Sequence, residues 1–343
     1  MKKLLFITPS FPKDDSESYM VCFLQHVFHA FVEKYKNVEV TIISTQKPIS
    51  TPYYWHGIKV IPLNGNNIRY PFKIIFLIKS FYKINRLKKE NKYDGILNLW
   101  YNDFSVYSHL TNQKTYSWML GQDVKRDNIF LRLFKPDSKK IIAISNYSNN
   151  VLYESIKIKA HKIIPIAVNK NLFPELNTNE RSIDVFGAGW LSPLKNYSLF
   201  LDIILELKNI NPNIKVEIAG IGTEESKLKE FVKTNQLEKN VTFLGLLSHK
   251  EILLKMNNSK IFLHTSTFEG GPTVYYEALY SGCQLVGTLQ TMDRAVENFY
   301  CANSKKDILI TLINLLENPK KPKRVIYYSM DYVCEEVYNL FYS

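Results

Sequence analysis

Cysteines, long apolar runs and metal-ligand spacings are scarce in this sequence of 343 residues. Its four cysteines, Cys22, Cys283, Cys301 and Cys334, form no CxxC pair or other spacing typical of a metal site. A reduced, cytoplasmic protein therefore explains them better than disulfides do. No stretch approaches the roughly 18 apolar residues that a membrane-spanning helix needs. Internal repeats and low-complexity tracts are also missing.

The composition is that of an ordinary globular protein, with 45% apolar and 22% charged residues. A chain of this length is long enough to form two domains. The N-terminal run MKKLLFITPSFP superficially resembles a signal peptide, but its apolar part, Leu4–Thr8, is too short. We therefore predict a buried first strand there.

The basic residues are unevenly distributed along the chain. Residues 1–168 contain 25 Lys and Arg against 12 Asp and Glu, whereas residues 169–343 contain 19 against 20. The whole excess behind the net charge of +12 thus lies in the first half. A domain of that sign suits an anionic membrane surface, a phosphorylated lipid or nucleic acid, although a generally Lys-rich surface is the simpler alternative. No helix-turn-helix, zinc spacing or RNP-like motif supports nucleic acid as the partner.

Short β-rich runs alternate with longer helical patterns throughout the chain. Several runs are apolar at every position, as in strands that are covered on both faces. The predicted strands span residues 4–8, 38–44, 95–100, 115–120, 140–145, 183–188, 214–220, 241–245, 260–265 and 284–287. The predicted helices span residues 20–34, 146–155, 196–209, 223–235, 248–257, 272–281 and 304–317. This double alternation predicts the α/β class, with two doubly wound parallel-sheet domains.

The predicted domain boundary is the polar segment Ile164–Ser182, which contains two prolines. We expect one domain over residues 1–168 and a second over residues 169–323. Residues 324–343 follow the run PKKPK and have the pattern of a final helix.

Glycines follow two of the predicted strands in the second half. Ligands of doubly wound sheets bind beyond the carboxyl ends of the strands. Gly187 and Gly189 stand at one such end, and Gly220 at the next. They allow backbone amides to approach a phosphate, although a tight strand–helix turn also needs glycine. Lys195 lies where the chain leads into the following helix. Its ammonium group suits a diphosphate, and the alternative is an ordinary solvated lysine.

The segment FEGGPTVYYEALYSG, Phe268–Gly282, is the most specific pattern in the chain. Glu269 precedes a Gly-Gly turn, Pro272 fits the first helical position, and Glu277 lies further along the helix. The free amides of the first turn and the helix dipole favour an anion. A carboxylate on each side suits a ligand in which a diphosphate joins two sugars, because Glu277 can grip a ribose diol. The simpler alternative is that acidic residues near this helix start only stabilise the helix dipole. That alternative would explain Glu269 but not Glu277.

The run HTSTFEGGPTVYYEALYSGCQLVG resembles the signature of retaining glycosyltransferases of family four, which have the GT-B fold. DVFGAGWLSPLKN, VEIAGIGTEESKL and VTFLGLLSHKEILLKM match that family in order and spacing. LGQDVK, IIAISNYSNNVL and KIIPIAVNKNLF agree with it in the first half. The resemblance implies two Rossmann-like domains facing across a cleft, with a nucleotide diphosphate-sugar donor held mainly by the second domain. It also implies that the final helix, within residues 324–343, crosses back to the first domain.

By that resemblance, Glu269 faces the donor sugar, Glu277 the ribose and Lys195 the diphosphate. The backbone amides of Gly270, Gly271 and Thr273, around Pro272, contact the sugar and the phosphates. The expected donor site is completed by Leu247, Gly187, Gly189 and Gly220. In the implied mechanism the departing diphosphate helps to deprotonate the acceptor, so the protein stabilises charge and positions the substrates. No DxD-type motif lies beside these residues, so we expect no metal or other cofactor.

Three departures from the family pattern concern the diphosphate contacts and the acceptor side. Trp190 stands where the family has Arg, and Leu120 stands where it has His, while Asp123 remains. The family's N-terminal Gly-Gly loop is replaced by Ser18-Tyr19-Met20. We take Asp123, Ser18 and Tyr19 as the acceptor-side residues.

Residues 66–92 contain eight Lys and Arg and one Glu, with Phe72, Ile75, Phe76 and Lys79 at helical spacing. Such a helix can lie on an anionic membrane or pack as an ordinary amphipathic helix on the sheet. We expect its apolar side to pack on the sheet and its basic rim to contact a membrane.

Together these patterns predict a cytoplasmic glycosyltransferase, peripheral on the inner face of the membrane. It would transfer a hexose-like sugar to a glycan or lipid-linked acceptor in cell-surface polysaccharide or lipopolysaccharide synthesis. A nucleotide-sugar epimerase of the same architecture is one alternative. A non-catalytic subunit that binds nucleotide sugars or glycans is another, which the missing His and Arg motivate.

Overall fold

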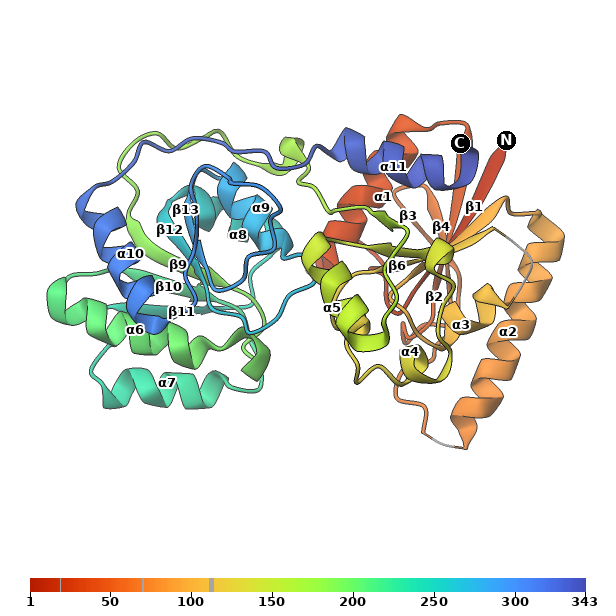
Figure 1. Cartoon of the computed structure of the whole chain (residues 1–343), viewed down its shortest axis with the longest axis horizontal. Coiled ribbons are helices and arrows are strands. Elements are labelled where there is room, and N and C mark those ends of the chain that lie inside the picture. Colours follow the sequence, from red (N-terminus) through yellow and green to blue (C-terminus); the bar gives the residue numbers. More distant parts are fainter. Residues whose placement is uncertain (19, 70, 111–113) are drawn as a thin grey trace. The chain divides into compact units, whose positions relative to one another are not determined.

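The computed structural model describes residues 1–343 except 19, 70 and 111–113. The chain divides into two compact units. The N-terminal unit comprises Met1–Ile166 and Met330–Ser343, and the C-terminal unit comprises Ala167–Ser329. Each has a sheet with helices along it (Figure 1). The last helix of the chain thus belongs to the N-terminal unit.

The sheet of the N-terminal unit has the strand order β3-β4-β2-β1-β5-β6-β7-β8. All neighbours are parallel except β3 and β4. The strands are β1 (Lys2–Thr8), β2 (Val38–Ser44), β3 (Tyr53–Trp55), β4 (Ile58–Pro62), β5 (Gly95–Leu99), β6 (Thr115–Met119), β7 (Ile141–Ala143) and β8 (Lys162–Ile163). The central strand β1 is buried from Leu4 onward, which explains its unbroken apolar sequence.

The helices of the N-terminal unit are α1 (Cys22–Lys34), α2 (Phe72–Asn91), α3 (Asp103–His109), α4 (Ile129–Leu133), α5 (Asn146–Ile156) and α11 (Met330–Tyr342). Helix α11 packs against α1. The rings of Tyr35 and Tyr338 stack with centroids 4.2 Å apart, and Lys162 pairs with Glu336 at 2.8 Å.

The antiparallel hairpin β3–β4 was not expected from the sequence. Its turn residues His56 and Gly57 both have positive φ, 43° and 80°. A two-residue turn with this geometry matches the twist of the flanking strands. Asn or Asp usually occupies the first of these positions, so the pair His-Gly is a weak signal.

The sheet of the C-terminal unit has the order β11-β10-β9-β12-β13-β14, and its strands are all parallel. The strands are β9 (Ile183–Ala188), β10 (Val216–Ala219), β11 (Val241–Gly245), β12 (Ser259–His264), β13 (Gln284–Gly287) and β14 (Phe299–Cys301). The helices are α6 (Tyr197–Ile210), α7 (Glu225–Thr234), α8 (His249–Asn257), α9 (Thr273–Tyr280) and α10 (Lys305–Glu317).

Side chains of this second sheet alternate between two buried cores. In β12, Ile261 and Leu263 join the core formed with α6, α7 and α10, whereas Phe262 joins the core formed with α8 and α9. Helices therefore cover both faces of the sheet, as the predicted doubly wound arrangement requires. The prediction of two Rossmann-like α/β domains is confirmed.

Among the described residues, no helix is both long and apolar enough to cross a bilayer.

Candidate active site

The order of the strands in the C-terminal unit marks where a ligand is expected. From β9 the chain winds outward through β10 and β11, and it then returns to β12 on the other side of β9. The carboxyl ends of β9 and β12 therefore flank the point where the winding direction reverses. Open α/β sheets bind their ligands at such a point. The loop after β9 carries Lys195, and the loop after β12 carries Glu269.

Backbone and hydroxyl groups hold these two loops together. The single hydrogen of the Thr265 hydroxyl is shared between the carbonyl oxygens of Lys195 and Asn196, which both lie 3.0 Å from Oγ1. The Thr267 amide donates to the carbonyl oxygen of Leu194 at 2.9 Å. These contacts hold the turn Pro193–Lys195 against the segment that leads to Glu269.

The Lys195 ammonium forms an ion pair with the Glu269 carboxylate. Ser266 Oγ donates to the same carboxylate oxygen at 3.0 Å, and His264 Nε2 lies 3.5 Å from it. The side chains of Lys195 and Glu269 are 20% and 18% exposed, so a ligand can reach them, while His264 is buried. The structure thus brings together two residues that lie 74 positions apart in the sequence.

This cluster keeps Glu269 ionised. Burial alone would raise the pKa of Glu269, but the hydrogen bond from His264 and the charge of Lys195 outweigh it and lower the pKa to about 2. Burial lowers the pKa of His264, so its ring is neutral near pH 7. A carboxylate with so low a pKa is a poor general base near neutral pH. It serves instead as a hydrogen-bond acceptor and a fixed negative charge.

The strand-end glycines differ in what surrounds them. A Cβ on Gly187 would meet the Phe200 ring at 2.9 Å, and a Cβ on Gly220 would meet the carbonyl oxygen of Gly189 at 1.9 Å. Close packing therefore explains glycine at these two positions without a ligand. A Cβ on Gly189 would lie 3.5 Å from the Lys195 side chain, so Gly189 borders the ion pair.

The helix that carries Glu277 begins one residue later than expected. Helix α9 starts at Thr273, so Pro272 is its N-cap and not its first helical residue. No side chain within the described part of the chain caps this end. Gly270 and Pro272 are buried, while Gly271 and Thr273 are half-buried. The expected anion site at this helix start stays a prediction.

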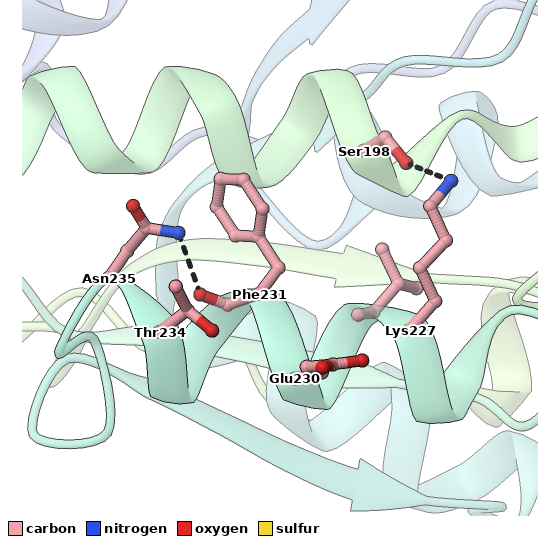
Figure 2. Close-up of a pocket in the computed structure, with 7 residues that line it drawn as sticks. Ser198, Lys227, Glu230, Phe231, Thr234 and Asn235 are labelled. Carbon is pink, nitrogen blue, oxygen red and sulfur yellow. Dashed lines mark hydrogen bonds between the residues drawn. The ribbon is translucent and has the colours of Figure 1, made fainter.

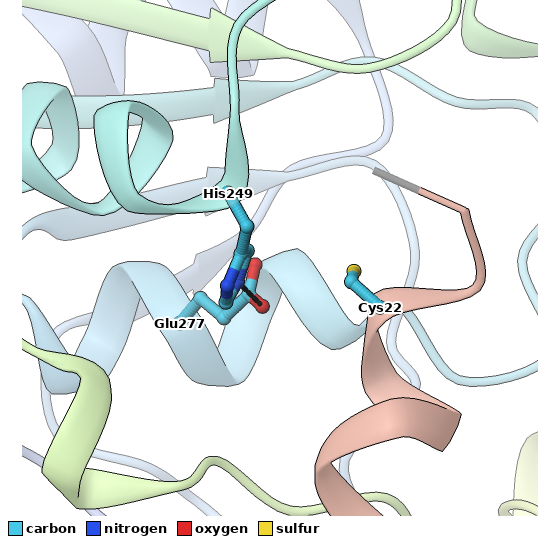
Figure 3. Close-up of side chains that lie close together, drawn as sticks. All are labelled: Cys22, His249 and Glu277. Carbon is cyan, nitrogen blue, oxygen red and sulfur yellow. Dashed lines mark hydrogen bonds and ion pairs between the residues drawn. The ribbon is translucent and has the colours of Figure 1, made fainter. Parts of the chain in front are cut away.

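Glu277 is part of a second polar pair. Its carboxylate accepts a hydrogen bond from His249 Nε2 at 2.8 Å, and both side chains are largely buried. Figure 3 shows them facing each other from α9 and the start of α8. Burial opposes protonation of His249, but the Glu277 carboxylate outweighs it and raises the pKa of His249. Leu247, just before α8, packs against the neighbouring core.

The acceptor-side predictions fall in the N-terminal unit. Asp123 accepts hydrogen bonds from the amides of Tyr101 at 2.9 Å and Gly121 at 2.8 Å. Burial raises its pKa to about 6 despite these bonds. The Ser18 carbonyl oxygen accepts a hydrogen bond from Gln25 at 3.2 Å. Tyr19 lies outside the described residues. Leu120 is buried, and Trp190 in the other unit is exposed.

A separate pocket of about 260 Å³ opens between α6 and α7 (Figure 2). Its lining includes Lys227, which donates to Ser198 at 3.4 Å, and Glu230. Neither Lys195 nor Glu269 lines it. We therefore place the candidate active site at the Lys195–Glu269 pair and not in this pocket.

One known protein family matches the C-terminal unit in sequence. Residues 168–331 match the family described as glycosyl transferases group 1. The match covers just under half of this chain and almost all of the C-terminal unit. The group 1 segment contains Lys195, Glu269, Glu277, His249 and the strand-end glycines.

Known proteins resemble the chain in sequence and in fold. One component of human phosphatidylinositol N-acetylglucosaminyltransferase is 32% identical over 155 residues, which cover 44% of this chain and 32% of that protein. The matches span about a third to a half of the curated relatives' own length.

Among solved structures, sucrose-phosphate synthase from Thermosynechococcus elongatus is similar, with a TM-score of 0.71 and 14% identity over 99% of this chain and 95% of that one. HepE from Anabaena, solved with UDP and glucose, has a TM-score of 0.68 and 15% identity over 99% and 96%. At such identities the likeness shows the fold alone, and that fold is GT-B.

The sequence did not point to three residues that complete the site. His264 and Ser266 lie just before Glu269 and contact it, and His249 contacts Glu277. His264 is the last residue of the largely apolar strand β12, so a polar residue at a strand end was an available signal. Nothing local marks His249, because only the packing of α8 against α9 brings it to Glu277.

Proposed function

We propose that the chain is a retaining, metal-independent glycosyltransferase that transfers a sugar from a nucleoside diphosphate to a glycan or lipid-linked acceptor. The match of residues 168–331 to the group 1 family and the GT-B fold support this activity. One observation carries the proposal. Lys195 and Glu269 form a partly exposed ion pair at the point where the sheet reverses its winding direction.

The chemistry of the pair suits transfer from a diphosphate. As the bond between the sugar C1 and the phosphate oxygen breaks, negative charge develops on the leaving diphosphate. The Lys195 ammonium stabilises that charge. The acceptor oxygen forms its bond to C1 on the same face, and its proton passes to the departing phosphate. Glu269 stays ionised, holds Lys195 in place and accepts hydrogen bonds from the sugar.

Glu277 is proposed to bind the ribose of the donor. Its pairing with His249 holds one carboxylate oxygen, and we propose that the second oxygen accepts hydrogen bonds from the ribose diol. The acceptor is proposed to bind through the N-terminal unit, where Asp123 and Ser18 lie. A role in cell-surface polysaccharide or lipopolysaccharide synthesis, at the cytoplasmic side of the membrane, is part of the same proposal.

The test is a thermal-shift panel of UDP-, GDP-, ADP- and TDP-sugars. We begin with UDP-glucose, because the similar HepE was solved with UDP and glucose. A donor at 100 times its Kd stabilises the fold by about 2.7 kcal/mol, which raises Tm by several degrees. One nucleotide sugar of the panel should raise the Tm of the wild type and of the control variant Lys229→Ala on α7. The same sugar should not raise the Tm of Lys195→Ala. If no member shifts the wild type, or if Lys195→Ala responds equally, the donor site is misplaced.

Product analysis separates transfer from its two alternatives. With the donor identified, NMR of the reaction should show a new glycosidic bond and free nucleoside diphosphate when a suitable glycan is present. An epimerase would alter or release the sugar without an acceptor. A non-catalytic binding protein would show the thermal shift but no product with any acceptor.

A further inference from the structure

Helix α2 has apolar side chains on two opposite faces. Phe76, Leu77, Phe81 and Leu87 pack against the core around the fully buried Ile84. An apolar side of the helix therefore packs on the first sheet, as expected, but of the three apolar residues named from the sequence only Phe76 belongs to it, because Phe72 and Ile75 are exposed. A surface helix normally carries polar residues opposite its core-facing side.

The opposite face of α2 is also apolar. Ile74, Ile78 and Tyr82 follow one another at intervals of four residues, and Ile75 precedes Ile78 by three, so their side chains form one stripe. Their exposed fractions run from 49% for Ile75 to 72% for Tyr82. Phe72, 67% exposed, extends the stripe at the start of the helix. Single exposed apolar residues are common on soluble proteins, but a continuous stripe indicates an interaction surface.

Basic side chains border this stripe. Lys79 and Lys83 each follow a stripe residue by one position, Lys89 lies two turns beyond Tyr82, and all three are exposed. Arg86 is exposed as well and pairs with Glu90 at 2.6 Å. The first turn of α2 contains no acidic residue. The exposed face is therefore apolar along its middle and positive along its edge.

We propose that this face of α2 lies on an anionic lipid bilayer, with Ile74, Ile78 and Tyr82 in the interface and the basic residues against the headgroups. The combination of an apolar stripe and a positive edge is that of helices that lie in the membrane plane. The charge argues against a second copy of the chain as the occupant, because two such helices would place like charges side by side. The inference concerns a surface distinct from the donor site and goes beyond the proposed reaction.

The test measures binding to vesicles by co-sedimentation. The wild type should bind phosphatidylcholine vesicles that contain about one third phosphatidylglycerol far more tightly than pure phosphatidylcholine, and high salt should weaken that binding. Each basic residue near an anionic surface contributes about fivefold to binding. Lys79→Gln/Lys83→Gln/Lys89→Gln should therefore lower the partition coefficient roughly 100-fold. Ile74→Ser/Ile78→Ser/Tyr82→Ser should also abolish most binding.

A control variant and a second readout keep the result unambiguous. Ile310→Ser/Lys306→Gln removes an exposed apolar and a basic residue from α10 and should bind vesicles like the wild type. The α2 variants should keep the wild-type Tm and its shift with the donor sugar. Equal binding to both vesicle types, or wild-type binding by both α2 variants, overturns the proposal. So does a wild-type dimer in light scattering that the apolar variant converts to monomer while lipid binding is absent. Failure of the donor panel would count against the glycosyltransferase proposal alone.

Discussion

Among single residues, Glu269 and Glu277 meet different neighbours, and each carboxylate is suited to a different task. Glu269 is held by a lysine, a neutral histidine and a serine, and its pKa falls to about 2. Its ionised form therefore stabilises the fold above its ordinary pKa of 4.5, and this contribution is lost as the pH falls towards 2. Glu277 instead faces a histidine whose pKa it raises. One carboxylate keeps its charge at any working pH, and the other is coupled to a group that titrates.

That coupling predicts a pH-dependent stability for the C-terminal unit. Because the pKa of folded His249 is raised above its ordinary 6.5, its contribution is fully present below that value and is lost as the pH rises through the raised pKa. His249→Gln should lower the free energy of unfolding by about 1 to 3 kcal/mol below pH 6.5, since the bond is charge-assisted. The deficit should shrink in alkaline buffer. Denaturant unfolding across pH measures it, and a deficit that does not change with pH would contradict the ion pair.

At the scale of strands and helices, the glycines at the ends of β10 and β11 differ in whether close packing requires them. Gly220 directly follows β10 with φ of +141°, and a side chain there would collide with the backbone of Gly189. Gly245 ends the neighbouring β11 with φ of +68° and open space around it. Gly220→Ala should therefore destabilise the fold by more than about 3 kcal/mol, because backbone must move, whereas Gly245→Ala should cost about 1 to 2 kcal/mol of backbone strain.

Urea denaturation of the two variants measures the difference. If Gly220→Ala kept wild-type stability but lost the thermal shift with the donor, Gly220 would be a ligand-binding glycine, as the family resemblance implies, and its packing role would be wrong.

Secondary structure was largely predictable at this scale. The bounds of β2, β9, β11 and β13 agree with the apolar runs, because buried parallel strands have unbroken apolar sequences between polar loops. The hairpin β3–β4 was not predicted, since its His-Gly turn is uncommon. The second apolar face of α2 was also not predicted, since periodicity alone does not say which apolar residues the sheet covers. The Lys195–Glu269 contact depends on bonds from Thr265 and Thr267 between distant loops, and no local pattern encodes it.

For the molecule as a whole, we propose different tasks for the two units. The N-terminal unit has the excess of positive charge and the exposed stripe of α2, and the C-terminal unit has the group 1 segment with the Lys195–Glu269 pair. If the proposals hold, a unit that faces the membrane and a unit that binds the donor together suit transfer to a lipid-linked acceptor. The central claim is that the Lys195–Glu269 pair is where the donor reacts.

The measurement that tests this claim most directly is the initial rate of sugar transfer at saturating donor. Wild type, Lys195→Ala and Glu269→Gln are compared with Lys229→Ala and Glu225→Ala, which break a surface ion pair on α7. Loss of one preorganised charge typically lowers kcat about 100- to 1000-fold, so we expect at least that loss for both site variants. Rates are measured well below the Tm of each variant, because loss of the ion pair also lowers the stability of the fold. Both control variants should retain wild-type rates. Site variants within about twofold of the wild type would contradict the account.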